Sequence, residues 1–302
     1  MDAEIDLVIN TFERTYRNVL APGTFRRVEE QNLRRFRRRV ALINNVGDLD
    51  DARRRAASLR DSGEIDEYHV VEDRLDKALA ATGLTRRDLG RIPHYSDCAL
   101  VAVTLPGAPW LLYWDAEVEL DRPYDWISPS VDLMEADERV VGASPTGSTG
   151  EARWSTLEVV GDFALSFGLS DQLFLARRKD LGRPIYGCSA LASLRFPLAH
   201  VAPVFEQRLD AYMRSVNRYR ASHLCAIYHH PKNQGFQHPR ATAPEKLRRV
   251  RNHLIFRILG FSKVRHRKLV VNCRPRTAGE RARLARWEEL WRAACAPAGG
   301  ES

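Results

Sequence analysis

Short apolar runs alternate with charged stretches of helical periodicity over the first part of the chain. The apolar runs are rich in β-branched and aromatic residues, as in buried strands, and cover residues 5–12, 39–48, 67–73 and 110–116. Apolar positions recur at helical spacing between these runs, over residues 24–37, 50–61, 74–83 and 95–105. Strands that alternate with helices predict an α/β fold with a mostly parallel central sheet and helices on both faces, a Rossmann-like arrangement.

The pattern is less regular beyond residue 120. We expect the following elements there: a helix and a strand over 125–145, an exposed Gly-rich loop over 145–154, helices over 169–181 and 195–216, an irregular stretch over 228–239, and basic, largely helical chain from 243. Ser170 or Asp171 is the expected N-cap of the helix over 169–181, because both residue types are preferred at that position.

The stretch LLYWDAEVEL, residues 111–120, changes from apolar to acidic halfway along. Asp115 ends the fourth strand, and Glu117 follows it two residues later. Ligands of open parallel sheets bind at the carboxyl ends of the strands, so these carboxylates are expected to face a cleft. Convergent carboxylate oxygens suit a hard cation such as Mg²⁺ or Mn²⁺, which can neutralise a departing diphosphate. A solvated turn is the alternative interpretation.

Composition limits the class of protein. The chain has 302 residues, of which 44% are hydrophobic, so it can bury the core of a large domain. No apolar run reaches the length of a membrane span, and the N-terminus carries no basic region or cleavage site of a secretion signal. The five cysteines are widely spaced and form no metal-binding pair. We therefore expect a cytoplasmic protein with reduced thiols.

The net charge of +8 is unevenly distributed. Residues 246–286 contain fourteen Lys or Arg residues and one acid, Glu280. Leu247, Val250, Leu254 and Ile258 share one helical stripe within this block. Such a stripe indicates a helix that covers the domain, an interfacial helix at the inner face of a membrane, or a homodimer contact.

The order of these segments resembles the GT-A fold of nucleotide-sugar glycosyltransferases, in particular family-2-like enzymes. The similarity extends over residues 5–181, and the segments that carry it are VINTFERT, ALINNVGDLDDARRRA, APWLLYWDAEVEL, DLMEADERVVGASP and LSDQLFLARRKDL. It implies a catalytic domain over residues 1–240, with a nucleotide-binding half at about 1–120 and an acceptor half at about 121–240. Residues 241–302 would then form a basic helical C-terminal segment.

The resemblance also implies roles for individual residues. Asp115 and Glu117 match the D-x-D metal motif, although the second acid here is Glu, which has a longer reach. Asp171 matches the acid that serves as general base in inverting members. The family often places a late histidine near the metal, which favours His229 or His230 and, less closely, His238. The positions that match the donor-binding segments are Thr11, Phe12, Glu13, Arg14, Asn45, Arg74, Trp114, Asp115 and Ala116.

The resemblance therefore implies an inverting, Mn²⁺- or Mg²⁺-dependent transfer of a sugar from a UDP- or GDP-type donor to an acceptor hydroxyl. One alternative is a nucleotidyltransferase, but the segment after the first strand lacks the Gly-rich, basic loop of that class. Another is a non-catalytic basic protein that binds RNA or an anionic membrane. The strand-end acids argue against nucleic acid, since they would repel phosphate unless a cation lay between them.

Overall fold

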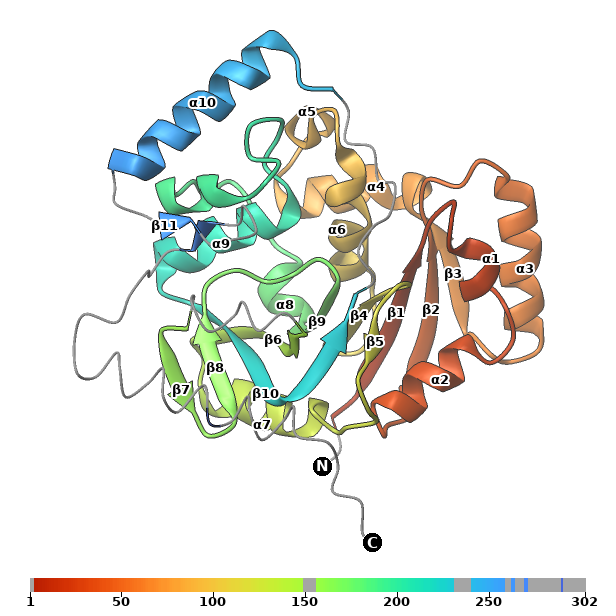
Figure 1. The fold of residues 1–302 in the computed structure, drawn as a ribbon. Helices are drawn as coiled ribbons and strands as arrows, with labels where there is room; N and C mark the ends of the chain where they lie inside the picture. The colour runs from red at the N-terminus through yellow and green to blue at the C-terminus, as the bar shows by residue number, and fades with distance from the viewer. Residues whose placement is uncertain are drawn as a thin grey trace, which may run out of the picture.

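A computed structural model of the chain describes residues 3–148, 156–230, 240–258, 262–263, 269–270 and 289 (Figure 1). Ten strands form one sheet: β1 (Ile5–Thr11), β2 (Arg38–Ile43), β3 (Glu67–Val70), β4 (Trp110–Asp115), β5 (Glu119–Leu120), β6 (Val140–Gly147), β7 (Glu158–Val160), β8 (Phe163–Ser166), β9 (Leu173–Arg177) and β10 (Tyr219–His229). A separate pair consists of β11 (Ser262–Lys263) and β12 (Leu269–Val270).

The helices lie mostly between the strands in sequence. They are α1 (Tyr16–Val19), α2 (Thr24–Gln31), α3 (Leu49–Asp61), α4 (Val71–Thr82), α5 (Arg86–Leu89), α6 (Asp97–Thr104), α7 (Ile127–Ala136), α8 (Arg178–Leu181), α9 (Phe205–Val216) and α10 (Ala243–Ile258), with 3-10 turns η1 (Pro93–Tyr95) and η3 (Leu191–Arg195). The expected helices over 50–61 and 74–83 are confirmed, and the latter ends at Gly83, whose φ of +71° is the left-handed conformation that favours glycine.

The sheet is mixed rather than mostly parallel, which corrects the prediction for its second half. Its strand order is β3-β2-β1-β4-β9-β6-β10-β8-β7, with β5 paired to β10. The first four strands in that order are parallel, as the alternation of strands and helices indicated. The antiparallel strand β9 then lies between β4 and β6 and reverses the direction of pairing.

Helices cover both faces of this sheet, as predicted (Figure 1). Helices α1, α2, α3 and α7 contribute to one apolar core, which contains Phe25, Leu59 and Met134. Helices α4, α6, α8 and α9 contribute to the other, which contains Leu79 and Phe205. The central strands are therefore buried on both sides, and apolar residues of β4 enter the two cores alternately.

The expected helix over residues 169–181 is wrong. Residues 173–177 form strand β9, and only 178–181 are helical. Leu173 and Leu175 enter one core, whereas Phe174 and Ala176 enter the other, so the whole run is buried at the centre of the sheet. A short continuous apolar run does not distinguish a buried strand from a helix, and flanking charges favoured the wrong choice.

Several predicted boundaries also differ from the structure. The third strand ends at Val70, because helix α4 starts immediately after it. The helix expected over 24–37 ends at Gln31. The helix expected over 195–216 starts at Phe205. Part of the loop expected over 145–154 is instead the buried end of β6, and residues 149–154 of it lie outside the described residues.

A buried ion group joins the amino ends of the parallel strands. Asp6 is fully buried and accepts hydrogen bonds from Arg38 Nη2 at 2.7 Å, Arg178 Nη2 at 3.2 Å and the Ala108 amide at 2.8 Å. A Cβ on Gly107 would lie 2.0 Å from Asp6 Oδ2, so this approach requires glycine. Burial raises the pKa of Asp6, but the hydrogen bonds from Arg38 and Ala108 outweigh burial and leave the pKa lowered.

Asp6→Asn is expected to reduce the free energy of unfolding at pH 7 by about 3–5 kcal/mol, because it removes the buried anion that pairs with Arg178 and Arg38, although Arg38 keeps a second carboxylate partner in Glu67. The lowered pKa means that ionised Asp6 stabilises the fold above its ordinary pKa and that this stabilisation is lost as the pH falls through the folded value. Urea denaturation should therefore show a smaller difference between variant and wild type at pH 3.5 than at pH 7. Asp61→Asn, at an exposed ion pair, is the control and should change little at either pH. An Asp6→Asn protein as stable as wild type at pH 7 would contradict the role of this group.

Candidate active site

Asp115 lies at the carboxyl end of β4, where a tight turn connects it to β5. The Val118 amide donates to the Asp115 carbonyl at 3.1 Å, and the Glu117 amide donates to Asp115 Oδ1 at 3.1 Å. The Asp115 amide itself donates to the carbonyl of Gln172 at 2.7 Å. This turn holds the Asp115 and Glu117 side chains close together, as their spacing of two residues predicted.

His230 reaches this turn through the pairing of β10 with β5. The two strands are antiparallel, with Tyr228 opposite Leu120 and His229 opposite Glu119, so the next residue arrives beside the turn. The His230 Nε2 atom lies 3.9 Å from Asp115 Oδ1 and 3.9 Å from Glu117 Oε2. Among the described residues, these three form the one group of His, Cys, Asp or Glu side chains whose ligand atoms lie within 4.8 Å of one another.

The three side chains fit a divalent cation. Their nearest oxygen and nitrogen atoms face one another at distances too long for hydrogen bonds, and two carboxylates beside each other repel unless a positive charge separates them. Two carboxylates and one imidazole are donors that Mn²⁺ accepts, and the side chains are largely buried, with 15–22% of their surface exposed. Asp115, Glu117 and His230 could therefore hold such a cation.

The environment of Asp115 is unusual for a carboxylate. Burial raises its pKa to about 6, although the Glu117 amide, His230 and Asn10 favour the charged form and partly oppose this shift. Asn10 lies opposite Asp115 in the register of β1 and β4 and is itself buried. Strongly shifted carboxyl groups concentrate at functional sites, so the turn has the electrostatic character of a site.

The other histidine proposed for the metal is placed apart from this group. The His229 ring faces Asp121, with its Nε2 atom 3.0 Å from Asp121 Oδ1, and both side chains are about half exposed. Adjacent residues of a strand point to opposite faces, which explains why His229 turns away from the turn that His230 approaches. His238 lies outside the described residues.

Asp171 lies in the loop before β9 and not on a helix, so the helix-capping alternative is wrong. The carbonyl of its neighbour Gln172 accepts the Asp115 amide, which places the loop directly beside the turn of Asp115 to Val118. Burial and the charge of Asp171 together raise the pKa of Tyr95 to about 12. Tyr228 also faces this loop, with its hydroxyl 3.4 Å from Gln172 Oε1. The loop that carries Asp171 therefore lies beside the turn of Asp115 and Glu117, but Asp171 is not one of the three candidate ligands.

The residues proposed for the nucleotide follow β1 and β2 at the same edge of the sheet. Glu13 Oε2 accepts the Gly47 amide at 2.6 Å and so joins the loop after β1 to the loop after β2. Arg14 stacks over the Phe12 ring at 5.4 Å. Thr11 is buried and lies 3.3 Å, oxygen to oxygen, from Thr15. Asn45 is exposed and has a φ of +48°.

The remaining donor-site candidates differ in exposure. Trp114 is buried in the core, and its Nε1 donates to the Val118 carbonyl at 3.1 Å. This hydrogen bond holds the end of the turn against the core. Ala116 lies within the turn and is half-buried. Arg74 is exposed on the first turns of α4, with its Nη2 atom 3.3 Å from His69 Nδ1. Arg74 is therefore the candidate with the least contact to the rest of this edge.

Three buried polar residues at this edge were not predicted. Asn44 Nδ2 donates to Asp97 Oδ1 at 2.9 Å, and the Cys98 amide donates to the same oxygen at 2.6 Å. Burial raises the pKa of Asp97. The Asn10 Oδ1 atom is buried and has no partner among the described residues. The sequence signal was present, because Asn10 is the last residue but one of β1 and Asn44 directly follows β2.

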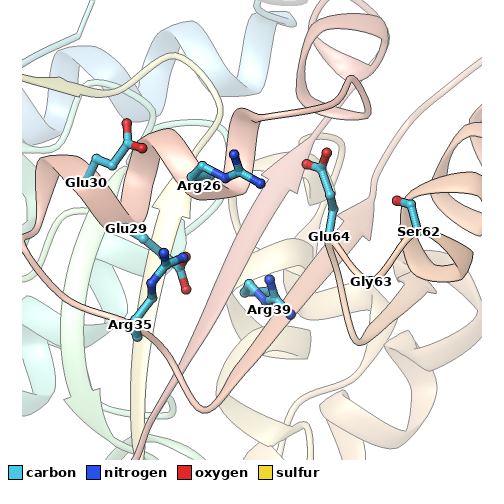
Figure 2. A pocket seen from close by; sticks show the side chains of 8 residues that line it. All are labelled: Arg26, Glu29, Glu30, Arg35, Arg39, Ser62, Gly63 and Glu64. Atoms are coloured by element: carbon cyan, nitrogen blue, oxygen red, sulfur yellow. The ribbon is translucent and has the colours of Figure 1, made fainter.

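A cavity of about 400 Å³ lies elsewhere, at the opposite end of β2 (Figure 2). Figure 2 shows the side chains of Glu29 and Arg35 meeting on one side of it, and their Oε2 and Nη1 atoms are 2.5 Å apart. Arg39 pairs with Asp66, and Glu64 accepts the Gly23 amide. Glu29, Arg35 and Arg39 are thus paired within the fold, and none of the residues that line this cavity belongs to the turn of Asp115 to Val118.

Comparison with known proteins found a likeness of structure only. No protein-family model and no curated protein matches the chain. Its structure is similar to glycosyltransferases of the GT-A type. One of these is GalNAc-T7 in complex with UDP, GalNAc and Mn²⁺, with 13% sequence identity and a TM-score of 0.46. The match covers 83% of this chain and 47% of the GalNAc-T7 chain. Two structures of glucosyl-3-phosphoglycerate synthase from Mycobacterium tuberculosis also match, each with 12% sequence identity and a TM-score of 0.33. One match covers 59% of this chain and 56% of the synthase chain, and the other covers 69% and 68%. The chain spans about half the length of the first two structures, and values this low leave function to be inferred from the site itself.

Proposed function

We propose that the protein is a metal-dependent glycosyltransferase that moves a sugar from a nucleoside-diphosphate donor to an acceptor hydroxyl. The observation that carries this proposal is the approach of Asp115, Glu117 and His230 to one point at the carboxyl edge of the parallel strands. A divalent cation bound there would offset the negative charge of the diphosphate leaving group.

Other residues of the same edge support the remaining parts of the reaction. The loops after β1 and β2, which Glu13 joins, would hold the nucleoside above the strand ends. Asp171 would accept the proton of the acceptor hydroxyl, since its loop is fixed against the metal-binding turn by the contact of Gln172 with Asp115. A base on the acceptor side of the sugar corresponds to transfer with inversion at the anomeric carbon.

The test is a thermal-shift panel of UDP, GDP and their sugars, each with and without Mn²⁺. We expect one nucleotide series to raise the melting temperature only when Mn²⁺ is present, because a ligand that binds the folded state stabilises it by mass action. Release of nucleoside diphosphate from the stabilising sugar nucleotide would then be measured. Stabilisation by nucleoside triphosphates alone would favour a nucleotidyltransferase, and the absence of any Mn²⁺-dependent nucleotide effect would contradict the proposal.

A further inference from the structure

Helix α10 exposes four aliphatic residues and buries two polar ones, Glu245 and Asn252, the reverse of what a core helix does. Leu247, Val250, Leu254 and Ile258 are 71%, 56%, 52% and 82% exposed. Their spacings of three and four residues place them on one side of the helix. On the opposite side, Glu245 is only 4% exposed, although carboxylates are rarely buried without a partner.

An ion pair holds the polar side of α10 against the body of the protein. Glu245 Oε2 lies 2.6 Å from Arg91 Nη2 and also accepts the Thr242 amide at 2.7 Å. Glu245 Oε1 accepts from Arg91 Nε at 3.1 Å. These bonds fix which side of the helix faces inward, so the apolar side faces outward. In Figure 1, α10 lies on the outside of the molecule, and it contacts the 3-10 turn η3.

Basic residues border the apolar stripe. At about 100° per residue, Lys246 lies beside one edge of the stripe and Arg251 beside the other. Lys246, Arg248, Arg249 and Arg251 are all exposed, whereas the acid of the helix, Glu245, is on the inner side. The outer face of α10, defined here as Leu247, Val250, Leu254 and Ile258 with Lys246 and Arg251 at its edges, therefore combines aliphatic surface with positive charge.

We propose that the outer face of α10 docks on an anionic lipid surface, with the aliphatic stripe among the acyl chains and the bordering cations at the headgroups. This combination is what distinguishes an interfacial helix from a core helix. An exposed apolar patch bordered by polar residues is also a common mark of an interaction surface. The proposal does not depend on sugar transfer, and none of its residues belongs to the turn of Asp115 to Val118.

Charge favours lipid over the other candidates for this face. A second copy that met this face with its own outer face of α10 would bring Lys246 and Arg251 of both copies together. Residues 259–302 of the same chain carry ten Lys or Arg against four acids, so they would also meet the face with like charge. Nucleic acid would match the charge but not the stripe, because single-strand binding sites use aromatic side chains on which bases stack, and these four residues are aliphatic.

The experiment is flotation of the full-length protein with vesicles of phosphatidylcholine alone and with about 30% phosphatidylserine added, both at low and physiological salt. We expect binding to the anionic vesicles and little to the neutral ones. Leu247→Gln with Leu254→Gln should reduce this binding about tenfold or more, because the buried apolar area is lost. Lys246→Gln with Arg251→Gln should reduce it about fivefold for each charge removed.

Leu191→Gln with Val216→Gln is the matched control, since it removes two exposed apolar residues, 54% and 47% exposed, that lie outside α10. It should bind vesicles as wild type does. Melting temperature and nucleotide binding should be unchanged in all three double variants, because the substituted side chains are exposed and none is among the residues of the candidate site. The proposal would be overturned by equal binding to neutral and anionic vesicles or by binding to neither. It would also be overturned if the protein bound RNA and the leucine variant kept that affinity. A concentration-dependent dimer in analytical ultracentrifugation that the same variant abolishes without any vesicle binding would overturn it as well.

Discussion

Asp115→Asn is expected to abolish Mn²⁺-dependent nucleotide binding while the protein remains folded. The substitution removes the negative charge that a cation needs but keeps an oxygen that can accept the Glu117 amide, so the turn itself is retained. Loss of a partner that only orients a metal ligand typically costs 10–100-fold in affinity, and we expect loss of the ligand to exceed about 100-fold. Isothermal titration calorimetry with Mn²⁺ and the stabilising nucleotide measures this directly.

Asp121→Asn is the matched control for this experiment. Asp121 lies six residues further along the chain, and its partner is His229, which faces away from the turn of Asp115 to Val118. The control should bind Mn²⁺ and nucleotide as wild type does. His230→Ala should weaken the Mn²⁺ response and His229→Ala should not, which separates the two adjacent histidines. Wild-type binding by Asp115→Asn would show that this turn is not the metal site.

Asp171→Asn is expected to lower the rate of sugar transfer by about a hundredfold or more while donor binding persists, since Asn cannot accept the acceptor proton. The residue lies in a loop and not at a helix N-terminus, so a capping role no longer competes for the explanation. The measurement is release of nucleoside diphosphate at saturating donor, together with the melting temperature. Asp162→Asn, in the exposed turn between β7 and β8, controls for loss of a surface aspartate. Turnover equal to wild type would exclude Asp171 as the base.

The parallel half of the fold could be predicted because its signals are local. Strands β1, β2 and β4 are each built around a short apolar run, and a polar residue ends the strand or directly follows it. The same rule located Asp115 and Glu117. Strand β9 could not be distinguished from a helix, because the residues from Leu173 to Ala176 form one continuous apolar run, which shows neither the alternation of a half-buried strand nor the period of a helix. The choice between His229 and His230 depends on the pairing of β10 with β5, which is two residues long and joins positions more than a hundred apart. No local pattern specifies such a pairing.

The insertion of β9 between β4 and β6 has a consequence for how the chain is made. As the polypeptide leaves the ribosome, β4 is complete some sixty residues before its antiparallel neighbour. Until then the run Trp110 to Trp114 has an unpaired edge, and unpaired apolar edges are where nascent chains associate wrongly. A chain that stops before residue 173 would therefore leave this edge of β4 without its partner strand.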